Sequence, residues 1–381
     1  MATIIGILCG RVLPTIILLL ALIVGWFAQH EQPLALFFAT VVPLSKGKWP
    51  PSIVGHGKMP GTPPVPDDMR PEPRPIHEGF LTLPGTGDLM PQNGLGMCCR
   101  DSAYDHVLVY RTVLWYLLMG GRHIDGASLY LNHEPIGAAI QEAVQRGIPR
   151  AEIFVTTKLP PPHFGYNKTK EQVPKYLSEL KLEYIDLILM HAPAVVPYLQ
   201  TNECTKRGLS NAACRKETWQ ALSELRDQGL VRNIGVSNFA VHHLQELEGF
   251  GAPIANNQIQ YSPFVDASEQ ATLQYCAAHN ITVTSYSPLG GLLEQDKAFT
   301  YSVLQEIAAK YERPVAQIML RWALQTGTAV IPGTGNPAHM RENLDIYNFR
   351  LADEDFDTIN NLKHAADAPL ITPMSQMLDM D

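Results

Sequence analysis

The chain has 381 residues, of which 46% are hydrophobic and 17% are charged, and its formal net charge is -8. This composition is that of a globular protein, long enough for one large domain with additional segments. The pI of about 5.9 and the lack of any basic run interleaved with aromatic residues argue against a nucleic-acid-binding surface. We therefore expect no nucleic acid among its partners.

Residues 1–42 form a hydrophobic N-terminal segment. Within it, Val12–Ala28 contains no ionisable side chain, and its length lies at the lower limit for crossing a bilayer. Trp26 would lie at the membrane interface, where tryptophan is common. We expect an uncleaved single-pass membrane anchor, with a cleaved signal peptide and a buried helix as the alternatives. The sequence does not determine on which side of the membrane the rest of the chain lies. The charges that flank the segment favour the lumenal side, whereas the supply of cofactor favours the cytosolic side.

Residues 43–78 are rich in proline, with clusters at 50–51, 63–66 and 71–75. Proline lacks the amide hydrogen and fixes φ, so neither helix nor sheet is expected here. We predict an extended, semi-rigid linker, with a proline-rich ligand for another protein as the alternative. The catalytic domain is then expected to span residues 79–381, including a C-terminal tail.

Six cysteines are present, and no pair has the C-x-x-C spacing of a common zinc site, so we predict no metal site. Cys204 and Cys214 flank a polar loop and would pair in an oxidising compartment. Asn167 and Asn280 each begin a glycosylation sequon, which weakly supports a lumenal position.

From residue 80 onward, strand and helix patterns alternate. A turn at Pro84–Gly87 separates two short apolar runs, which predicts a β-hairpin. Eight strand patterns follow: Gly94–Met97, Arg122–Asp125, Ile153–Lys158, Ile185–Met190, Asn233–Val236, Asn257–Tyr261, Thr282–Tyr286 and Thr328–Ile331. Helical patterns follow these strands: Tyr104–Met119, Pro135–Arg146, Glu171–Leu180, Lys216–Gln228, Val241–Leu247, Ala267–Ala278, Tyr301–Tyr311, Val315–Gln325 and Pro337–Leu344, with a last one at Asp353–Leu362. The nearly all-apolar strands indicate a parallel sheet covered on both faces, so we predict a (β/α)8 barrel preceded by the hairpin.

Four chemically matched side chains follow or end three consecutive strands: Asp125, Tyr130, Lys158 and His191. Because neighbouring barrel strands end at one face, these side chains can converge. A lysine cation stabilises a phenolate, a carboxylate keeps that lysine charged, and a histidine can bind a carbonyl oxygen. The set suits protonation of an oxygen while hydride reaches its carbon. Singly, each residue has a structural explanation, such as an ordinary ion pair or a loop-closing histidine.

The chain resembles the aldo-keto reductase family over residues of about 80–365, in six ordered motifs. The first is Asp125-Gly-Ala-Ser-Leu-Tyr130, with Asn132 and Glu134. The others are Tyr184–Pro193, Gly235–Phe239, Asn257–Ile259, Ser285–Gly290 and Ile331–Asn336. The resemblance implies a carbonyl reductase that uses NADP (as NADPH) or NAD. It also implies that Tyr130 is the general acid, that Lys158 and Asp125 tune it, and that His191 orients the carbonyl.

The same resemblance implies cofactor contacts along later strand ends. Ser237, Asn238 and Gln258 would hold the nicotinamide carboxamide, and Tyr286 would stack on the ring. Ser287 and Leu289 would lie along the pyrophosphate. The adenosine end would be surrounded by Thr334, His339, Glu342 and Asn343.

Two departures from the family pattern alter these expectations. Many members carry a lysine at the position of Gly333 and an arginine at that of His339, where they pair with the 2′-phosphate of NADP. The preference for NADPH is therefore weakened, so NAD is an alternative, unless Arg341 or another cation compensates. Many members also place tryptophans where this chain has Cys98 and Ala192, which implies a wider substrate pocket with less stacking surface.

We therefore predict an enzyme that reduces an aldehyde or ketone to an alcohol, as a monomeric barrel acting on a small carbonyl substrate. The competing hypothesis is a non-catalytic, nicotinamide-binding regulatory or scaffold module attached to a membrane. The missing phosphate-binding cations motivate that alternative, and the intact set of four residues argues against it.

Overall fold

The computed structural model describes residues 62–75, 77–98, 105–194, 202–265, 267–290 and 295–365. Its first two strands, β1 (Phe80–Thr82) and β2 (Leu89–Pro91), pair antiparallel with Leu81 opposite Met90. The predicted hairpin is therefore confirmed.

A second sheet contains eight strands that pair in parallel in the order of the chain. They are β3 (Leu95–Gly96), β4 (His123–Asp125), β5 (Phe154–Leu159), β6 (Ile185–Met190), β7 (Val231–Ser237), β8 (Asn256–Gln260), β9 (Thr282–Tyr286) and β10 (Ala329–Val330). The first and last strands meet: the Gly94 amide donates to the Val330 carbonyl at 2.8 Å, and the Gly96 amide donates to the Pro332 carbonyl at 3.2 Å. The sheet is closed, and the predicted (β/α)8 barrel is confirmed.

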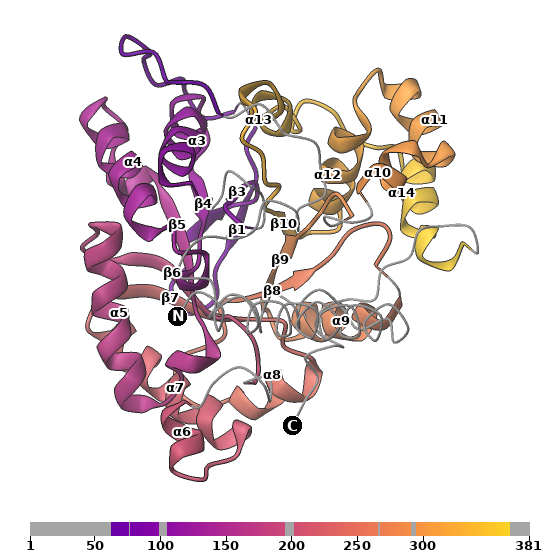
Figure 1. Ribbon diagram of the computed structural model, residues 1–381. Helices are drawn as coiled ribbons and strands as arrows, with labels where there is room; N and C mark the ends of the chain where they lie inside the picture. Colours follow the sequence, from indigo (N-terminus) through magenta and orange to yellow (C-terminus); the bar gives the residue numbers. More distant parts are fainter. Residues whose placement is uncertain are drawn as a thin grey trace, which may run out of the picture. The chain divides into compact units, whose positions relative to one another are not determined.

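Helices surround these strands (Figure 1). Those after β3 to β6 are α3 (His106–Leu118), α4 (His133–Gln145), α5 (Tyr166–Leu180), α6 (Glu203–Lys206) and α7 (Asn211–Asp227). Those after β7 to β10 are α8 (Val241–Leu247), α9 (Gln270–Ala278), α10 (Gln295–Thr300), α11 (Ser302–Tyr311), α12 (Val315–Gln325), α13 (Pro337–Leu344) and α14 (Asp353–Asn360). The short helices α6 and α10 have no counterpart in the predicted pattern.

Strand side chains alternate between the barrel interior and the helices, as the pleat requires. On β6, Leu187 and Leu189 pack in one cluster with Leu83 and Met90 of the hairpin segment. The intervening Ile188 packs in the larger cluster that includes helix residues. The hairpin segment therefore supplies apolar side chains to the cluster that holds the inward residues of the strands.

Residues 62–75 contain no helix or strand, in agreement with their prolines, but they are not a free spacer. Their backbone contacts α3, because the Glu72 amide donates to the Leu118 carbonyl at 2.7 Å and Trp115 Nε1 donates to the Pro63 carbonyl at 2.9 Å. Met69 packs partly buried against the core. We refer to residues 62–75 as the N-terminal strap.

The predicted single-pass membrane localisation is wrong for the part of the chain that the structure describes. Each helix in these stretches falls short of the length or the apolar character that crossing a bilayer requires. The run at residues 12–28, on which the prediction was based, lies outside the described residues, as do residues 1–42 as a whole.

Candidate active site

Three neighbouring strands bring the four predicted side chains to one end of the barrel. Asp125 ends β4, Lys158 lies near the end of β5, and His191 directly follows β6. Tyr130 ends a single turn of 3-10 helix, Ser128–Tyr130, which follows β4. The alternation of the strands sends Asp125 and Lys158 to the interior.

Asp125 and Lys158 form an ion pair that is 2% and 1% exposed, respectively. Lys158 Nζ lies 2.5 Å from Asp125 Oδ1 and donates also to the Gly126 carbonyl at 2.9 Å. Burial lowers the pKa of Lys158, and the Asp125 carboxylate opposes that effect. Burial alone would favour the neutral form of Lys158, and the Asp125 carboxylate favours its charged form.

Tyr130 contacts both Lys158 and His191. Its hydroxyl lies 3.4 Å from His191 Nε2, and Lys158 Nζ lies 5.0 Å from the centre of its ring. The Tyr130 ring meets the His191 ring edge to face, with centres 5.6 Å apart. A phenol, an ammonium and an imidazole therefore meet within one small volume.

His191 is uncharged at neutral pH in this environment. Burial, and then the Lys158 ammonium, lower the pKa of His191 well below its usual range. Its backbone is fixed on both sides: the amide donates to the Leu159 carbonyl at 2.9 Å, and the carbonyl accepts from Asn238 Nδ2 at 3.1 Å. The neutral ring can donate one N–H to an oxygen beside Tyr130.

The residues predicted for the nicotinamide carboxamide are linked to one another. Asn238 Nδ2 donates to Ser237 Oγ at 3.1 Å, and the Tyr286 hydroxyl donates to Asn238 Oδ1 at 2.8 Å. Ser237 Oγ donates to the Gln258 carbonyl at 2.8 Å. Burial raises the pKa of Tyr286, so this phenol stays neutral. The side chains of Ser237, Asn238 and Tyr286 and the backbone carbonyl of Gln258 thus form one hydrogen-bonded group.

Two of these strand ends have an unusual backbone. Asn238 and Ser287 adopt left-handed conformations, with φ of 62° and 50°. Such backbones cost free energy in residues other than glycine and concentrate at ligand-binding sites. They directly follow β7 and β9, the strands that end in Ser237 and Tyr286.

A family model described as the aldo/keto reductase family matches residues 94–364. The chain belongs to the aldo/keto reductase family. It is therefore an oxidoreductase of a family whose members reduce aldehydes and ketones with NADPH or NADH.

Named relatives agree with this assignment. The chain is 36% identical to a 9,11-endoperoxide prostaglandin H2 reductase of Trypanosoma cruzi, over 72% of this chain and 88% of that protein. It is 37% identical to a glyoxal reductase of Bacillus subtilis, over 72% and 89% of the two chains. A methylglyoxal reductase of Escherichia coli K12 is 34% identical, over 72% and 90%.

Solved structures of the family have the same fold. An aldo-keto reductase from a deep-sea metagenome library matches with a TM-score of 0.64 and 32% identity, over 74% of this chain and 94% of that one. An aldo/keto reductase of Brucella melitensis matches with a TM-score of 0.63 and 33% identity, over 74% and 97%.

In this aldo/keto reductase, the residues predicted for the adenosine end lie just before α13 (Thr334) or within it (His339, Glu342 and Asn343). Thr334 and Asn343 are buried, whereas His339 and Glu342 are exposed. Ser287 and Leu289 follow β9 and are half-buried. Arg341, the suggested substitute cation, makes two hydrogen bonds of 2.9 and 3.0 Å to Glu72 of the N-terminal strap. Its charge is thus already paired.

The two predicted substrate-pocket residues follow strand ends on the same side as Tyr130. Cys98 follows β3 and Ala192 follows β6, and both are half-buried. The segment after Ala192 is held by Arg215, whose Nη1 donates to the Pro193 carbonyl at 3.0 Å. Arg215 is itself paired with Glu246 through two hydrogen bonds of 2.7 and 2.8 Å. The helical pattern in the sequence beside Arg215 gave no indication that this side chain contacts the segment after Ala192.

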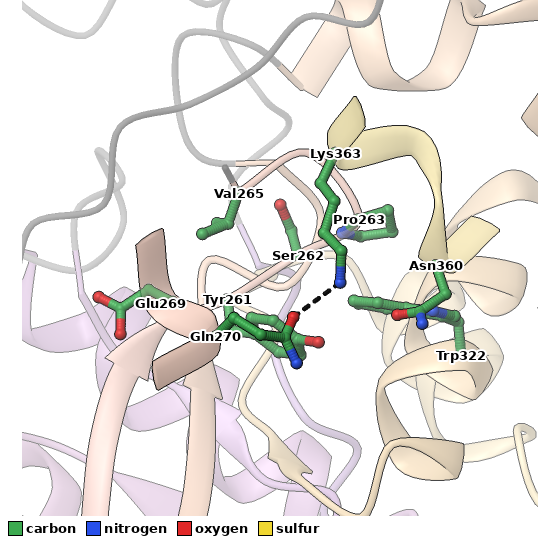
Figure 2. Close-up of a pocket in the computed structure, with 9 residues that line it drawn as sticks. All are labelled: Tyr261, Ser262, Pro263, Val265, Glu269, Gln270, Trp322, Asn360 and Lys363. Atoms are coloured by element: carbon green, nitrogen blue, oxygen red, sulfur yellow. Dashed lines mark hydrogen bonds between the residues drawn. The ribbon is translucent and has the colours of Figure 1, made fainter. Parts of the chain in front are cut away.

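A small cavity of about 10 Å³, lined by none of the predicted site residues, lies between the loop after β8 and the helices α12 and α14 (Figure 2). Tyr261 and Trp322 line it with ring centres 5.1 Å apart, and Lys363 Nζ donates to Gln270 Oε1 at 2.7 Å beside it. It has room for about one water molecule. It is too small for a carbonyl substrate or a nucleotide.

Proposed function

We propose that this enzyme reduces an aldehyde or ketone to an alcohol, with Tyr130 as the proton donor. The observation that carries the proposal is the meeting of Tyr130, Lys158 and His191 at one barrel end, with Asp125 behind Lys158. The family assignment supports the reaction class.

Each side chain has a distinct role in this proposal. Tyr130 gives its proton to the substrate oxygen, and the Lys158 ammonium stabilises the phenolate that remains. Asp125 keeps Lys158 charged and oriented. His191, being neutral, donates a hydrogen bond to the same oxygen without competing for its proton.

The described residues fit a nicotinamide cofactor. Ser237, Asn238 and Gln258 carry the amide and hydroxyl groups that a carboxamide can bind, and the left-handed backbones of Asn238 and Ser287 are of a kind that concentrates at ligand-binding sites. A bound NADPH or NADH would supply the hydride. Tyr286, held by its hydrogen bond to Asn238, would support the ring.

We propose NADPH as the cofactor, with NADH as a competing donor. Gly333 and the exposed His339 supply no permanent cation for a 2′-phosphate, and Arg341 is paired with Glu72. The discrimination between the two cofactors should therefore be small. Thr334, Glu342 and Asn343 would surround the adenosine end, and Ser287 and Leu289 the pyrophosphate.

We propose small, reactive carbonyl compounds as substrates, with Cys98 and Ala192 lining their pocket. Relatives named for glyoxal and methylglyoxal support this class. Ala192 has a small side chain, whereas Cys98 is disulfide-bonded, so a somewhat larger aldehyde should enter on the side of Ala192.

The test is reduction of methylglyoxal and of a nitrobenzaldehyde by the full chain, followed as loss of NADPH or NADH absorbance. Tyr130→Phe should lower kcat/KM by roughly a hundredfold to ten-thousandfold, because general acid catalysis is lost. Tyr166→Phe is the matched control, because its hydroxyl donates to Glu224 on the outer helices. An unchanged rate for Tyr130→Phe would refute the role of Tyr130. Cofactor binding without turnover of any aldehyde would refute the reaction.

A further inference from the structure

One hydrogen bond crosses the barrel interior and joins the predicted cofactor group to the predicted proton-donating group. We infer that Gln258 is a positioning residue that holds Asp125, and through it Lys158, in place for Tyr130. Asp125 in turn fixes which end of the Gln258 amide faces a bound nicotinamide. The inference rests on the proposed function and extends it.

The topology makes this contact unusual. Gln258 lies on β8 and Asp125 on β4, which are four strands apart in either direction around the ring. Both side chains point inward by the alternation of their strands, and each is 2% exposed. Gln258 Nε2 donates to Asp125 Oδ2 at 2.7 Å. The bond therefore connects opposite walls of the barrel.

This bond completes the coordination of the carboxylate. Lys158 donates to Oδ1 of Asp125 and Gln258 donates to Oδ2, so each carboxylate oxygen has its own hydrogen-bond donor. Without Gln258, a buried carboxylate oxygen would lose its hydrogen-bond donor, which is unfavourable. Asp125 would then turn both oxygens toward Lys158 and draw the ammonium away from the Tyr130 ring. The phenolate of Tyr130 would lose part of its stabilisation.

The same bond fixes the polarity of the glutamine amide. An ionised carboxylate only accepts hydrogen bonds, so the NH₂ end of Gln258 must face Asp125. Its Oε1 is then the end left for a ligand, and it can only accept. A carboxamide NH₂ is a matching donor. The backbone carbonyl of Gln258 is held separately by Ser237 Oγ and the Asn238 amide, at 2.8 and 3.0 Å.

The first test uses the full chain without cofactor and follows tyrosinate absorbance against pH. Subtraction of the Tyr130→Phe curve, in each background, isolates the ionisation of Tyr130. Among the described residues, the titratable groups that face it are Lys158 from β5, His191 after β6 and Asp125 from β4. Gln258→Met keeps the volume and removes both polar ends. We expect the pH of half-ionisation of Tyr130 to rise by about one unit, a tenfold loss in acidity.

Gln172→Met is the matched control, because Gln172 is also buried but lies on α5 and donates to Glu171. It should leave the Tyr130 titration unchanged. If Gln258→Met titrates like the wild type, the positioning role is overturned. If Gln258→Met does not fold, Gln258→Asn, too short to reach Asp125, should give the same shift, and its absence would overturn the inference.

The second test addresses the amide polarity through binding, measured by quenching of protein fluorescence. The probes are NADH and its 3-acetylpyridine analogue, which lacks the carboxamide NH₂. The wild type should bind NADH about tenfold more tightly than the analogue, as expected for one hydrogen bond to a buried acceptor. Gln258→Met should bind the two alike, and equal discrimination by both proteins would overturn this half of the inference. A wild type that lacks turnover would refute the proposed function but would leave both readouts intact.

Discussion

Two histidines, His123 on β4 and His191 directly after β6, differ in role because their ring nitrogens meet different groups. His191 keeps Nε2 beside the Tyr130 hydroxyl, where a substrate oxygen can also reach it. His123, at the start of β4, uses both nitrogens within the fold. Its Nδ1 lies 3.1 Å from the Pro91 carbonyl and its Nε2 lies 2.9 Å from Thr156 Oγ1. In the proposed mechanism the His191 ring binds the substrate oxygen, whereas the His123 ring joins the hairpin to the barrel.

His123 should make the protein sensitive to acid. Burial lowers its pKa from 6.5 to about 4. Between these values the unfolded chain binds a proton that the folded chain excludes, so stability is complete above pH 6.5 and falls as the pH drops toward 4. Between pH 7 and pH 4.5 this group should remove roughly 2–3 kcal/mol from the free energy of unfolding.

His123→Gln should remove that part of the acid sensitivity, because glutamine does not titrate there and still offers a donor and an acceptor. The measurement is urea unfolding at both pH values, with His364→Gln, at an exposed position, as the control. If the two variants lose the same stability between pH 7 and pH 4.5, the assignment of His123 is wrong.

At the scale of elements, α6 is a single helical turn that is too short to be stable alone. It is fixed in two ways. A capping box joins Asn202 and Thr205, and a disulfide joins Cys204 of α6 to Cys214 of α7. The sequence analysis gave this pairing only as conditional on an oxidising compartment, and the structure contains the disulfide.

The disulfide closes a loop with a sequence separation of 10 residues, for which the chain-entropy estimate is about 2–3 kcal/mol. A Cys204→Ser and Cys214→Ser double variant should therefore melt a few degrees below the wild type in thermal scans. Dithiothreitol should lower the melting temperature of the wild type by more than that of the double variant, in which the disulfide of Cys98 can still be reduced. Cys276→Ser, at the buried free cysteine, is the control for loss of a thiol. A wild type that is indifferent to reductant would contradict the contribution of this bond.

The sequence predicted the repeating strands and helices of the barrel. It did not predict the hydrogen bonds between residues that lie far apart in the chain. Strands such as Ile185–Met190 and helices such as Val241–Leu247 agree with the prediction because an apolar run and an apolar periodicity are both local patterns. The positions of Asp125 and Lys158 followed from strand order alone. In contrast, the bond from Gln258 to Asp125 spans 133 residues, and no local pattern records which end of an amide faces a carboxylate. The hydrogen bond from Arg215 to the Pro193 carbonyl likewise joins separate parts of the chain and has no local sequence signal.

At the scale of the whole molecule, the N-terminal strap extends the folded unit beyond the repeating barrel. Its exposed ion pair, Glu72 with Arg341, is worth only about 0–1 kcal/mol. More of its stability should come from Met69 and Val65, which pack against the core. Composition predicted an extended linker because proline excludes helix and sheet, but it could not show what the apolar side chains between the prolines contact.

The N-terminal strap also explains why position 120 is occupied by glycine. Gly120 follows α3 with a φ of 97°, and a Cβ there would lie 2.2 Å from the Pro73 carbonyl oxygen. Gly147 follows α4 with a φ of 109°, but a Cβ there would meet nothing within 4 Å. Alanine at either position incurs the cost of a left-handed backbone, about 1–2 kcal/mol. Only at Gly120 must it also displace the strap.

Gly120→Ala should therefore destabilise the protein by about 1–3 kcal/mol more than Gly147→Ala, since backbone atoms must move and buried contacts are lost. Hydrogen exchange supplies the decisive measurement. The Glu72 amide, bonded to the Leu118 carbonyl, should exchange faster in Gly120→Ala and at the wild-type rate in Gly147→Ala. Equal stability and equal exchange in the two variants would mean that the strap does not depend on close approach to α3. A selective change at Glu72 would place the start of the folded unit within the proline-rich segment, upstream of residue 79.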